Sequence, residues 1–108
     1  MNSFGLDDDD REAILSIFEA YPEIESVVLY GSRAKGNFKP GSDIDLVLTG
    51  TKLTDRILLD IRAELRDSNV PYVCDVIAEC EVRDADLKQE IKTTGQLFYE
   101  RIPVKTTV

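Results

Sequence analysis

The sequence predicts an α/β (α+β) domain with a small mixed β-sheet and helices packed mainly on one face. Two observations support this class. Segments with apolar residues at helical spacing alternate with short runs rich in β-branched and aromatic residues, in the order helix, strand, turn, strand, helix, strand, helix. The length of 108 residues suits a single domain over residues 1–108, with a real core but no second substrate-binding domain.

Composition excludes several classes of function. A net charge of −8 argues against non-specific nucleic-acid binding, so no direct DNA binding is expected. The absence of histidine removes Ser-His and Cys-His mechanisms and leaves zinc little support. No run of about 18 apolar residues is present, and the acidic N-terminus is unlike a secretory signal. We therefore expect no membrane association, a cytoplasmic location, and Cys74 and Cys80 as free buried thiols in a reducing compartment.

The first helix is predicted from Asp7 to Ala20. Ile14, Ile17 and Phe18 fall on one face at helical spacing. The aspartates at positions 7–10 lie at its first turn, where the helix dipole stabilises negative charge. We prefer this explanation to a metal-binding cluster. Proline at position 22 ends the helix, and residues 24–30 lead into the first strand.

The stretch from Gly31 to Asp45 carries the strongest functional signal. It begins with Gly-Ser and, after ten more residues, ends with Asp-Ile-Asp, between strand-like apolar runs at residues 27–30 and 46–48. Residues two apart on a strand point to the same face, about 6.5–7 Å apart, so Asp43 and Asp45 should stand side by side. Two such carboxylates repel each other. Mg²⁺, which favours one or two carboxylates plus phosphate oxygens, relieves that repulsion.

The other end of this stretch suits a phosphate group. Gly31 allows close approach of the backbone to a ligand, Ser32 adds a hydroxyl, and the next residues can begin a short helix with free N–H groups. Between Ser26 and Ser42 there are three basic residues, at positions 33, 35 and 39, and no acidic one, so the rest of the chain carries −11 (−8 minus +3). This basic island is consistent with a nucleoside triphosphate or with a solvated loop.

The remaining elements follow from the same signals. A helix is predicted from about Thr54 to Asp67 with Thr54 as N-cap, a third strand from Tyr72 to Ala78, and a final helix from Asp84 to about Thr94 that stops at Gly95. The tail over residues 96–104 is apolar for a terminus. It either packs back on the domain or forms a docking surface.

Asp75 lies in the middle of the third predicted strand, flanked by apolar residues. An ionised carboxylate buried there needs a cation or a hydrogen-bond network. Asp75 is either an edge-strand residue exposed to water or a third carboxylate beside Asp43 and Asp45. Glu79 is the second candidate for that third position.

The pattern Gly-Ser-x10-Asp-x-Asp resembles the signature of the DNA polymerase β-type nucleotidyltransferase superfamily. The short chain is similar to the minimal nucleotidyltransferases, or MNT proteins, found in prokaryotes beside HEPN-domain partners. The signature covers 15 of 108 residues, and the order of elements extends the resemblance over most of the chain. The resemblance implies the nucleotidyltransferase fold and a third acidic residue on a later strand, which Asp75 matches best.

The resemblance also implies a chemistry. It implies a nucleotidyltransferase that uses two Mg²⁺ ions and ATP, with Asp43, Asp45 and Asp75 as catalytic and metal-binding residues. The nucleotide-binding residues would be Gly31, Ser32, Arg33 and Lys35.

For the acceptor, the resemblance implies transfer of AMP from ATP to a tyrosine hydroxyl of a partner HEPN toxin, which makes the chain the antitoxin of a type VII-like toxin–antitoxin pair. One alternative is a non-catalytic antitoxin that neutralises its partner by docking. Another is nucleotidyl transfer to a small molecule. The sequence leaves the acceptor, the base preference and a possible homo-oligomer open.

Overall fold

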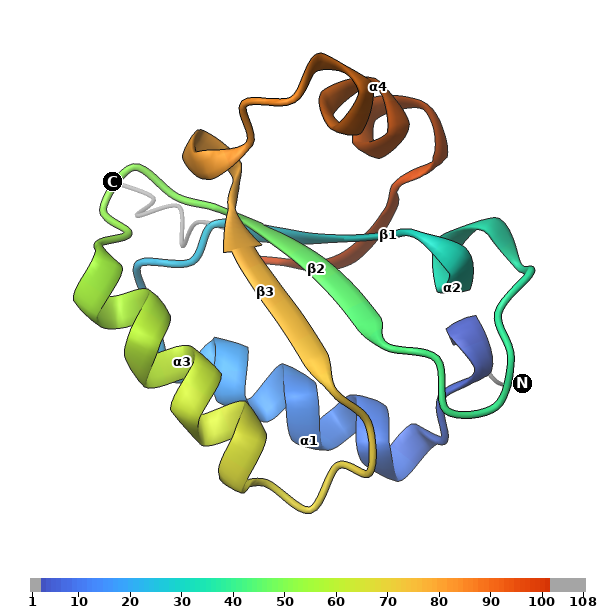
Figure 1. The fold of residues 1–108 in the computed structure, drawn as a ribbon. Coiled ribbons are helices and arrows are strands. Elements are labelled where there is room, and N and C mark those ends of the chain that lie inside the picture. The colour runs from blue at the N-terminus through green and yellow to red at the C-terminus, as the bar shows by residue number, and fades with distance from the viewer. Residues whose placement is uncertain (1–2, 102–108) are drawn as a thin grey trace, which may run out of the picture.

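The computed structural model describes residues 3–101 and contains one mixed sheet with strand order β3-β2-β1-β4 (Figure 1). The strands are β1 (Ser26–Tyr30), β2 (Ile44–Thr49), β3 (Cys74–Ala78) and β4 (Gln96–Glu100). The helices are α1 (Asp8–Glu19), α2 (Ser32–Lys35), α3 (Asp55–Asp67) and α4 (Ala85–Thr94), with short 3-10 turns at Ser3–Gly5 and Glu79–Glu81. The predicted α/β class and mixed sheet are confirmed.

The pairing of the strands follows from the connections between them. β1 runs antiparallel to β2 and to β4, whereas β2 and β3, which are joined through α3, run parallel. A parallel pair requires a crossover of this kind, because the chain must return to the same end of the sheet. Leu46 in β2 lies opposite Leu29 of β1 and Val76 of β3, so one apolar row crosses three strands.

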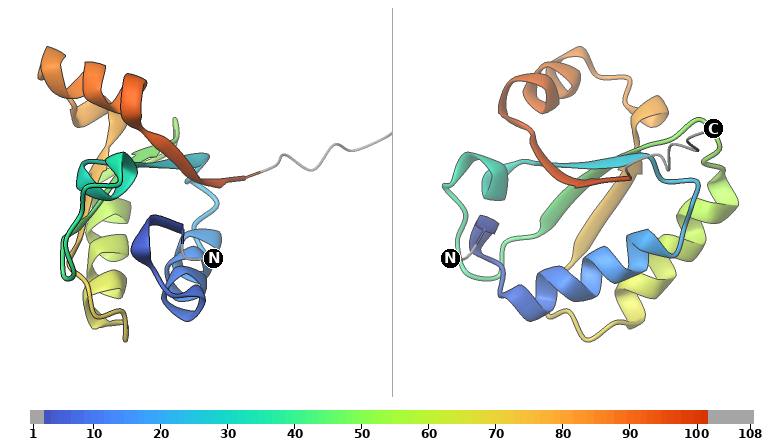
Figure 2. Two further views of the ribbon diagram at one scale, coloured as in Figure 1. Left: turned by 90° about the vertical axis from the view of Figure 1, so that its right-hand side faces the viewer. Right: turned by 180° about the vertical axis from the view of Figure 1, so that it is seen from behind.

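The main core lies between one face of the sheet and the two long helices. Figures 1 and 2 show α1 and α3 side by side on that face, in agreement with the predicted one-sided packing. The alternation of β2 sends Ile44, Leu46 and Leu48 into this core. The α1 helix contributes Ile14 and Phe18, as its apolar spacing predicted, and α3 contributes Leu58, Ile61 and Leu65.

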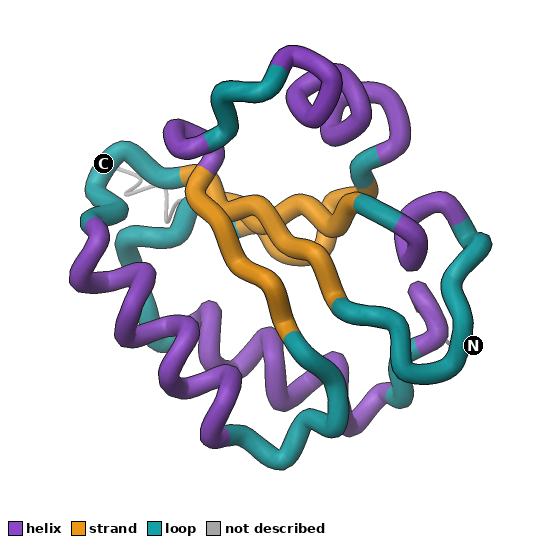
Figure 3. The backbone as a smooth tube through the Cα atoms, viewed as in Figure 1, coloured by secondary structure: helices purple, strands orange, loops and turns teal. Residues whose placement is uncertain are grey.

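The opposite face of the sheet is covered by α4. Figure 3 shows the strands between the two long helices and α4. A smaller apolar cluster forms there around Tyr30, Val47 and Val82, with Leu87 and Ile91 of α4 packed against it. This second face is the one toward which the odd-numbered residues of β2 point.

Two helix ends were predicted from capping residues, at Thr54 and at Gly95. Thr54 caps α3, since its Oγ1 accepts a hydrogen bond from the Ile57 amide at 3.2 Å. Gly95 ends α4 for a different reason than expected. Its φ is −64°, which any residue adopts, but a Cβ there would overlap the carbonyl oxygen of Ile91 and lie 2.7 Å from Cγ1 of Val28. Across residues 3–101 no helix has the length and apolarity that crossing a membrane requires.

Strand β4 was not predicted as a strand. The apolar tail packs back on the domain over residues 96–100, where it pairs with β1, while the prediction for residues 102–104 lies outside the described residues. Phe98 is 4% exposed and its ring centroid lies 6.2 Å from that of Phe4 and 6.3 Å from that of Phe18. Leu97, on the other face of the same strand, is 56% exposed.

Substitution of these two neighbours tests the placement of β4. Phe98→Ala should lower the free energy of unfolding by about 3–5 kcal/mol, because it empties a buried aromatic site. Leu97→Ala should change it by about 0.5 kcal/mol or less, because that side chain is mostly in water. Urea denaturation of both variants checks this, and equal effects would contradict the register of β4.

Candidate active site

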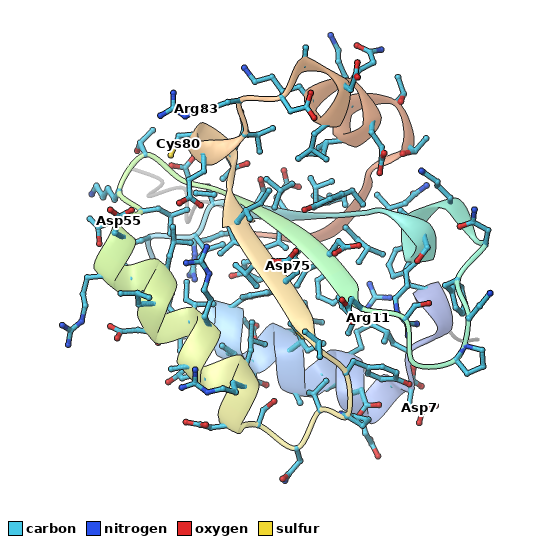
Figure 4. All side chains as sticks on the ribbon, viewed as in Figure 1. Asp7, Arg11, Asp55, Asp75, Cys80 and Arg83 are labelled. Carbon is cyan, nitrogen blue, oxygen red and sulfur yellow. The ribbon has the colours of Figure 1, made fainter. Side chains whose placement is uncertain are left out.

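Three polar side chains form a row across the second face of the sheet. Asp45 of β2 lies opposite Tyr30 of β1 and opposite Asp75 of β3. Neighbouring strands are about 4.8 Å apart and residues in register point to the same face, so Asp45 and Asp75 stand side by side. Asp43 lies just before β2, two residues from Asp45. In Figure 4, Asp75 lies near the middle of the molecule, well away from Asp55 at the start of α3.

The convergence of these carboxylates shows in their electrostatics. Burial raises the pKa of Asp45, and the negative charges of Asp75 and Asp43 raise it further, with an added contribution from Glu90. Burial also raises the pKa of Tyr30 to about 12, assisted by the same charges of Asp45, Asp75 and Glu90. Negative charge therefore accumulates on this face at the Tyr30–Asp45–Asp75 row.

The donor set at this row suits a hard divalent cation. Asp43, Asp45 and Asp75 supply carboxylate oxygens, which are the ligands that Mg²⁺ prefers. Asp45 is half-buried, whereas Asp43 and Asp75 are exposed, so the group opens to water on one side. As the side chains stand, no three Asp, Glu or Cys residues among those described are close enough to enclose a metal ion. A cation between these carboxylates would offset the repulsion that raises the pKa of Asp45.

Gly31 brings the turn after β1 against this row. Its φ is +77°, in the region that favours glycine, and a Cβ at this position would overlap Oδ2 of Asp45. Ser32 follows as the first residue of α2 and is half-buried, and the short helix ends at Gly36 with φ +83°. Gly31 and Asp45, which lie 14 positions apart in the sequence, are therefore in direct contact.

Arg33 occupies a different environment from the one its predicted contact with phosphate requires. Its side chain is 3% exposed. Nε and Nη2 donate to the carbonyl oxygen of Ser42 at 3.1 and 2.9 Å, and Nη1 donates to that of Phe4 at 2.8 Å. The guanidinium also lies over the rings of Phe38 and Tyr72, with its Cζ 5.0 and 4.7 Å from their centroids. In this structure Arg33 fastens α2 to the loop before Asp43 and offers no free face to a nucleotide.

Lys35, unlike Arg33, has an accessible side chain, as its predicted contact with phosphate requires. Its side chain is 40% exposed, and Nζ lies 3.6 Å from Oε1 of Glu90. Glu90, on α4, is a fourth carboxylate near the row, and sequence reasoning missed it. Only the packing of α4 across the sheet brings Glu90 to this point, so the local sequence around it held no signal.

Two other sequence expectations are corrected. Glu79, the second candidate for the third carboxylate, lies four positions beyond Asp75, where its Oε2 accepts a hydrogen bond from Thr49 Oγ1 at 2.8 Å.

Both cysteines are free, as expected, but Cys80 is exposed in the 3-10 turn. Cys74 is half-buried, and burial raises its pKa to about 11. Glu79 and Cys80 line a hollow of about 580 Å³ between the sheet and α4.

A comparison with protein-family models gives one match over most of the chain. The family described as polymerase beta, nucleotidyltransferase matches residues 12–103. The chain belongs to this nucleotidyltransferase family. The matched region of this nucleotidyltransferase includes the turn at Gly31 and the carboxylates Asp43, Asp45 and Asp75, so it covers the whole candidate site.

Solved structures show the same fold. A chain of a toxin–antitoxin complex crystallised with AMP-PNP has 19% identity and a TM-score of 0.68, covering 84% of this nucleotidyltransferase and 73% of that chain. A complex of a tri-AMPylated HEPN toxin with an MNT antitoxin from Shewanella oneidensis gives 17% identity and a TM-score of 0.62, covering 85% and 71%. A nucleotidyltransferase described as putative, from Sulfolobus solfataricus, gives 21% and 0.54, covering 84% and 77%. A search of curated proteins gives no match.

The raised pKa of Asp45 predicts how stability depends on pH. In the window above the ordinary carboxyl pKa and up to the raised one, the folded chain holds more protons than the unfolded chain, so the free energy of unfolding falls as pH rises. Asp45→Asn removes this ionisation and should flatten the decline in the pH range that begins at the ordinary carboxyl pKa of about 4. Urea denaturation across this range checks it. The exposed control Asp55→Asn should keep the wild-type slope, and an unchanged slope in Asp45→Asn would contradict the assigned repulsion.

The buried guanidinium predicts a second effect on stability. Arg33→Lys keeps the charge but cannot reach the carbonyls of both Ser42 and Phe4, so we expect a loss of about 2–4 kcal/mol in the free energy of unfolding. Thermal or urea denaturation measures this loss. Lys39→Met, on the exposed loop, is the control and should change little. A fully stable Arg33→Lys protein would show that these hydrogen bonds do not hold the loop.

Proposed function

We propose that this chain is a Mg²⁺-dependent nucleotidyltransferase that transfers AMP from ATP to a tyrosine hydroxyl of a HEPN-domain partner and so acts as its antitoxin. The observation that carries the proposal is the pairing of Asp45 with Asp75 in the sheet, with Gly31 pressed against Asp45. This arrangement puts carboxylate oxygens beside a half-buried glycine turn, a combination that suits a metal–triphosphate complex.

Asp43, Asp45 and Asp75 would hold the magnesium ions. When bound, the metal supplies charge neutralisation at the phosphates and a fixed orientation of the triphosphate. Asp45 is the most buried of the three, so it gains most from a cation that offsets the neighbouring negative charges.

The turn and α2 would bind the phosphates. Gly31 permits close approach of the backbone and the Ser32 hydroxyl adds a donor. Lys35 is the basic side chain of α2 that reaches the site, and a triphosphate would compete with Glu90 for its ammonium group. Arg33 contributes indirectly, because its hydrogen bonds to Ser42 fix the backbone immediately before Asp43.

In the reaction, the acceptor oxygen forms a bond to the α-phosphorus of ATP as the bond from that phosphorus to the bridging oxygen breaks. Pyrophosphate leaves, and AMP stays on the acceptor. The carboxylate of Asp75 would take the acceptor's proton, and its exposure on an edge strand supports this role because an acceptor can approach it there. Catalysis of this kind depends on positioning and electrostatic stabilisation.

The proposed acceptor rests on family and fold. Similar chains occur in toxin–antitoxin crystal structures, one with AMP-PNP and one in which the HEPN toxin is tri-AMPylated. The chain described here spans most of their length and has a similar fold. The competing function is neutralisation of the partner by docking alone, and the experiment below separates the two.

Removal of two carboxylates should abolish the transfer. Asp43→Ala combined with Asp45→Ala is expected to reduce AMP transfer by roughly 100-fold or more, because the charge that holds and orients the metal is lost. The assay incubates the chain with ATP, Mg²⁺ and the HEPN-domain protein encoded beside it. Mass spectrometry then counts AMP units on the partner.

The matched control is Asp55→Ala combined with Asp60→Ala, which removes two exposed carboxylates of α3 and should leave transfer intact. Circular dichroism should show both double variants folded. Undiminished transfer by Asp43→Ala/Asp45→Ala would refute the catalytic assignment. Neutralisation of the partner by wild type without any AMP on it would support the docking function instead.

A further inference from the structure

Strand β3 forms one edge of the sheet, and its parallel pairing fixes which backbone groups face outward. The amide of Ile44 donates to the carbonyl of Val73 at 2.8 Å, and Asp45 lies opposite Asp75. In a parallel ladder this pattern uses the N–H and C=O of alternate residues, here Asp75 and Ile77, for β2. The corresponding groups of the residues between them, at positions 74, 76 and 78, therefore point away from the sheet.

The far half of this edge is already closed by side chains. Arg62 of α3 donates from Nε and Nη2 to the carbonyl of Val76 at 2.9 and 2.7 Å. Glu81 accepts a hydrogen bond from the amide of Ala78 at 2.9 Å, and its Oε1 lies 3.7 Å from Nη2 of Arg62. This ion pair occupies the edge where another strand would pair.

The near half of the edge is open. Among the described residues, no side chain hydrogen-bonds the N–H or C=O of Cys74 or the N–H of Val76. A groove of about 350 Å³ runs along this part of the edge and is lined by residues that include Arg66, Tyr72 and Asp75. Val73, also in the lining, is 66% exposed and presents an apolar contact to solvent.

We propose that this open half of the β3 edge receives an extended, acidic segment of the acceptor protein, added as a short strand that presents its hydroxyl at Asp75. The identity of the segment as the acceptor rests on the function proposed above. Backbone groups at positions 74 and 76 provide strand pairing, and Val73 provides an apolar contact. Asp75 points to the catalytic face from the same strand, so a paired segment lies beside the carboxylate that takes its proton.

The positive charge of Arg66 in the groove favours an acidic segment. The chain as a whole carries −8, yet Arg66 of α3 lines the groove, beside Arg62, whose guanidinium is already paired with Glu81. Arg66 pairs only with its exposed neighbour Asp67, with Nε to Oδ1 at 3.6 Å, and its side chain is 74% exposed. Acidic residues of the incoming segment therefore find complementary charge at the end of the groove near Arg66.

The test compares two charge reversals on α3. Arg66→Glu reverses a charge that lines the groove. Arg56→Glu makes the same change on the same helix but outside the groove, where Arg56 pairs with Asp60. The probe is the HEPN-domain protein encoded beside this chain, with affinity measured by calorimetry. Arg66→Glu should weaken binding about tenfold or more, and Arg56→Glu should change it by about twofold or less.

Amide hydrogen exchange supplies the second readout. The amides of Cys74 and Val76 should exchange more slowly in the complex, because they donate to the added segment. Equal affinities of the two variants, unprotected amides, or no complex at all would overturn the proposal. The AMP-transfer assay is separate. A protected edge without AMP on the partner would refute the enzymatic function and leave the docking site standing, whereas transfer with an unprotected edge would do the reverse.

Discussion

The contact between Gly31 and Asp45 is the constraint on which the rest of the site depends. The carboxylate of Asp45 lies where the side chain of any other residue at position 31 would be. This contact joins the turn after β1 to the start of β2 and so fixes the distance between the proposed phosphate-binding turn and the proposed metal ligands. The sheet adds Asp75 to the same point through parallel pairing. Three separate segments thus meet at Asp45.

The buried side chain of Arg33 stabilises this arrangement. Its guanidinium hydrogen-bonds the carbonyls of Ser42 and Phe4 and lies between two aromatic rings. The loop between α2 and β2 contains exposed glycine and proline residues, and the hydrogen bonds from Arg33 to Ser42 join the end of this loop to α2. Arg33, one of the basic residues of α2, thus stabilises the fold, and the exposed Lys35 remains the α2 side chain proposed to bind phosphate.

The sequence was sufficient for most of the fold and for the expectation that Asp75 lies beside Asp45. Apolar spacing in α1 and α3, the Thr54 cap and the two central strands were all predictable because each depends on residues close together in the chain. Asp75 was recognisable because a charge inside an apolar strand run is unusual. Local pattern could not reveal that Arg33 is buried, that Glu90 approaches Lys35, or that residues 96–100 form a strand. Each of these depends on partners far away in the sequence.

The Arg62–Glu81 pair has a further consequence for how the protein behaves at high concentration. An uncovered edge strand invites copies of the same chain to join edge to edge and grow into larger aggregates. Here the covered carbonyl of Val76 and the covered amide of Ala78 leave room for only a brief pairing. Too little of the β3 edge remains for copies of the chain to form a stable intermolecular sheet through this strand, whereas the short docking segment proposed above would still fit.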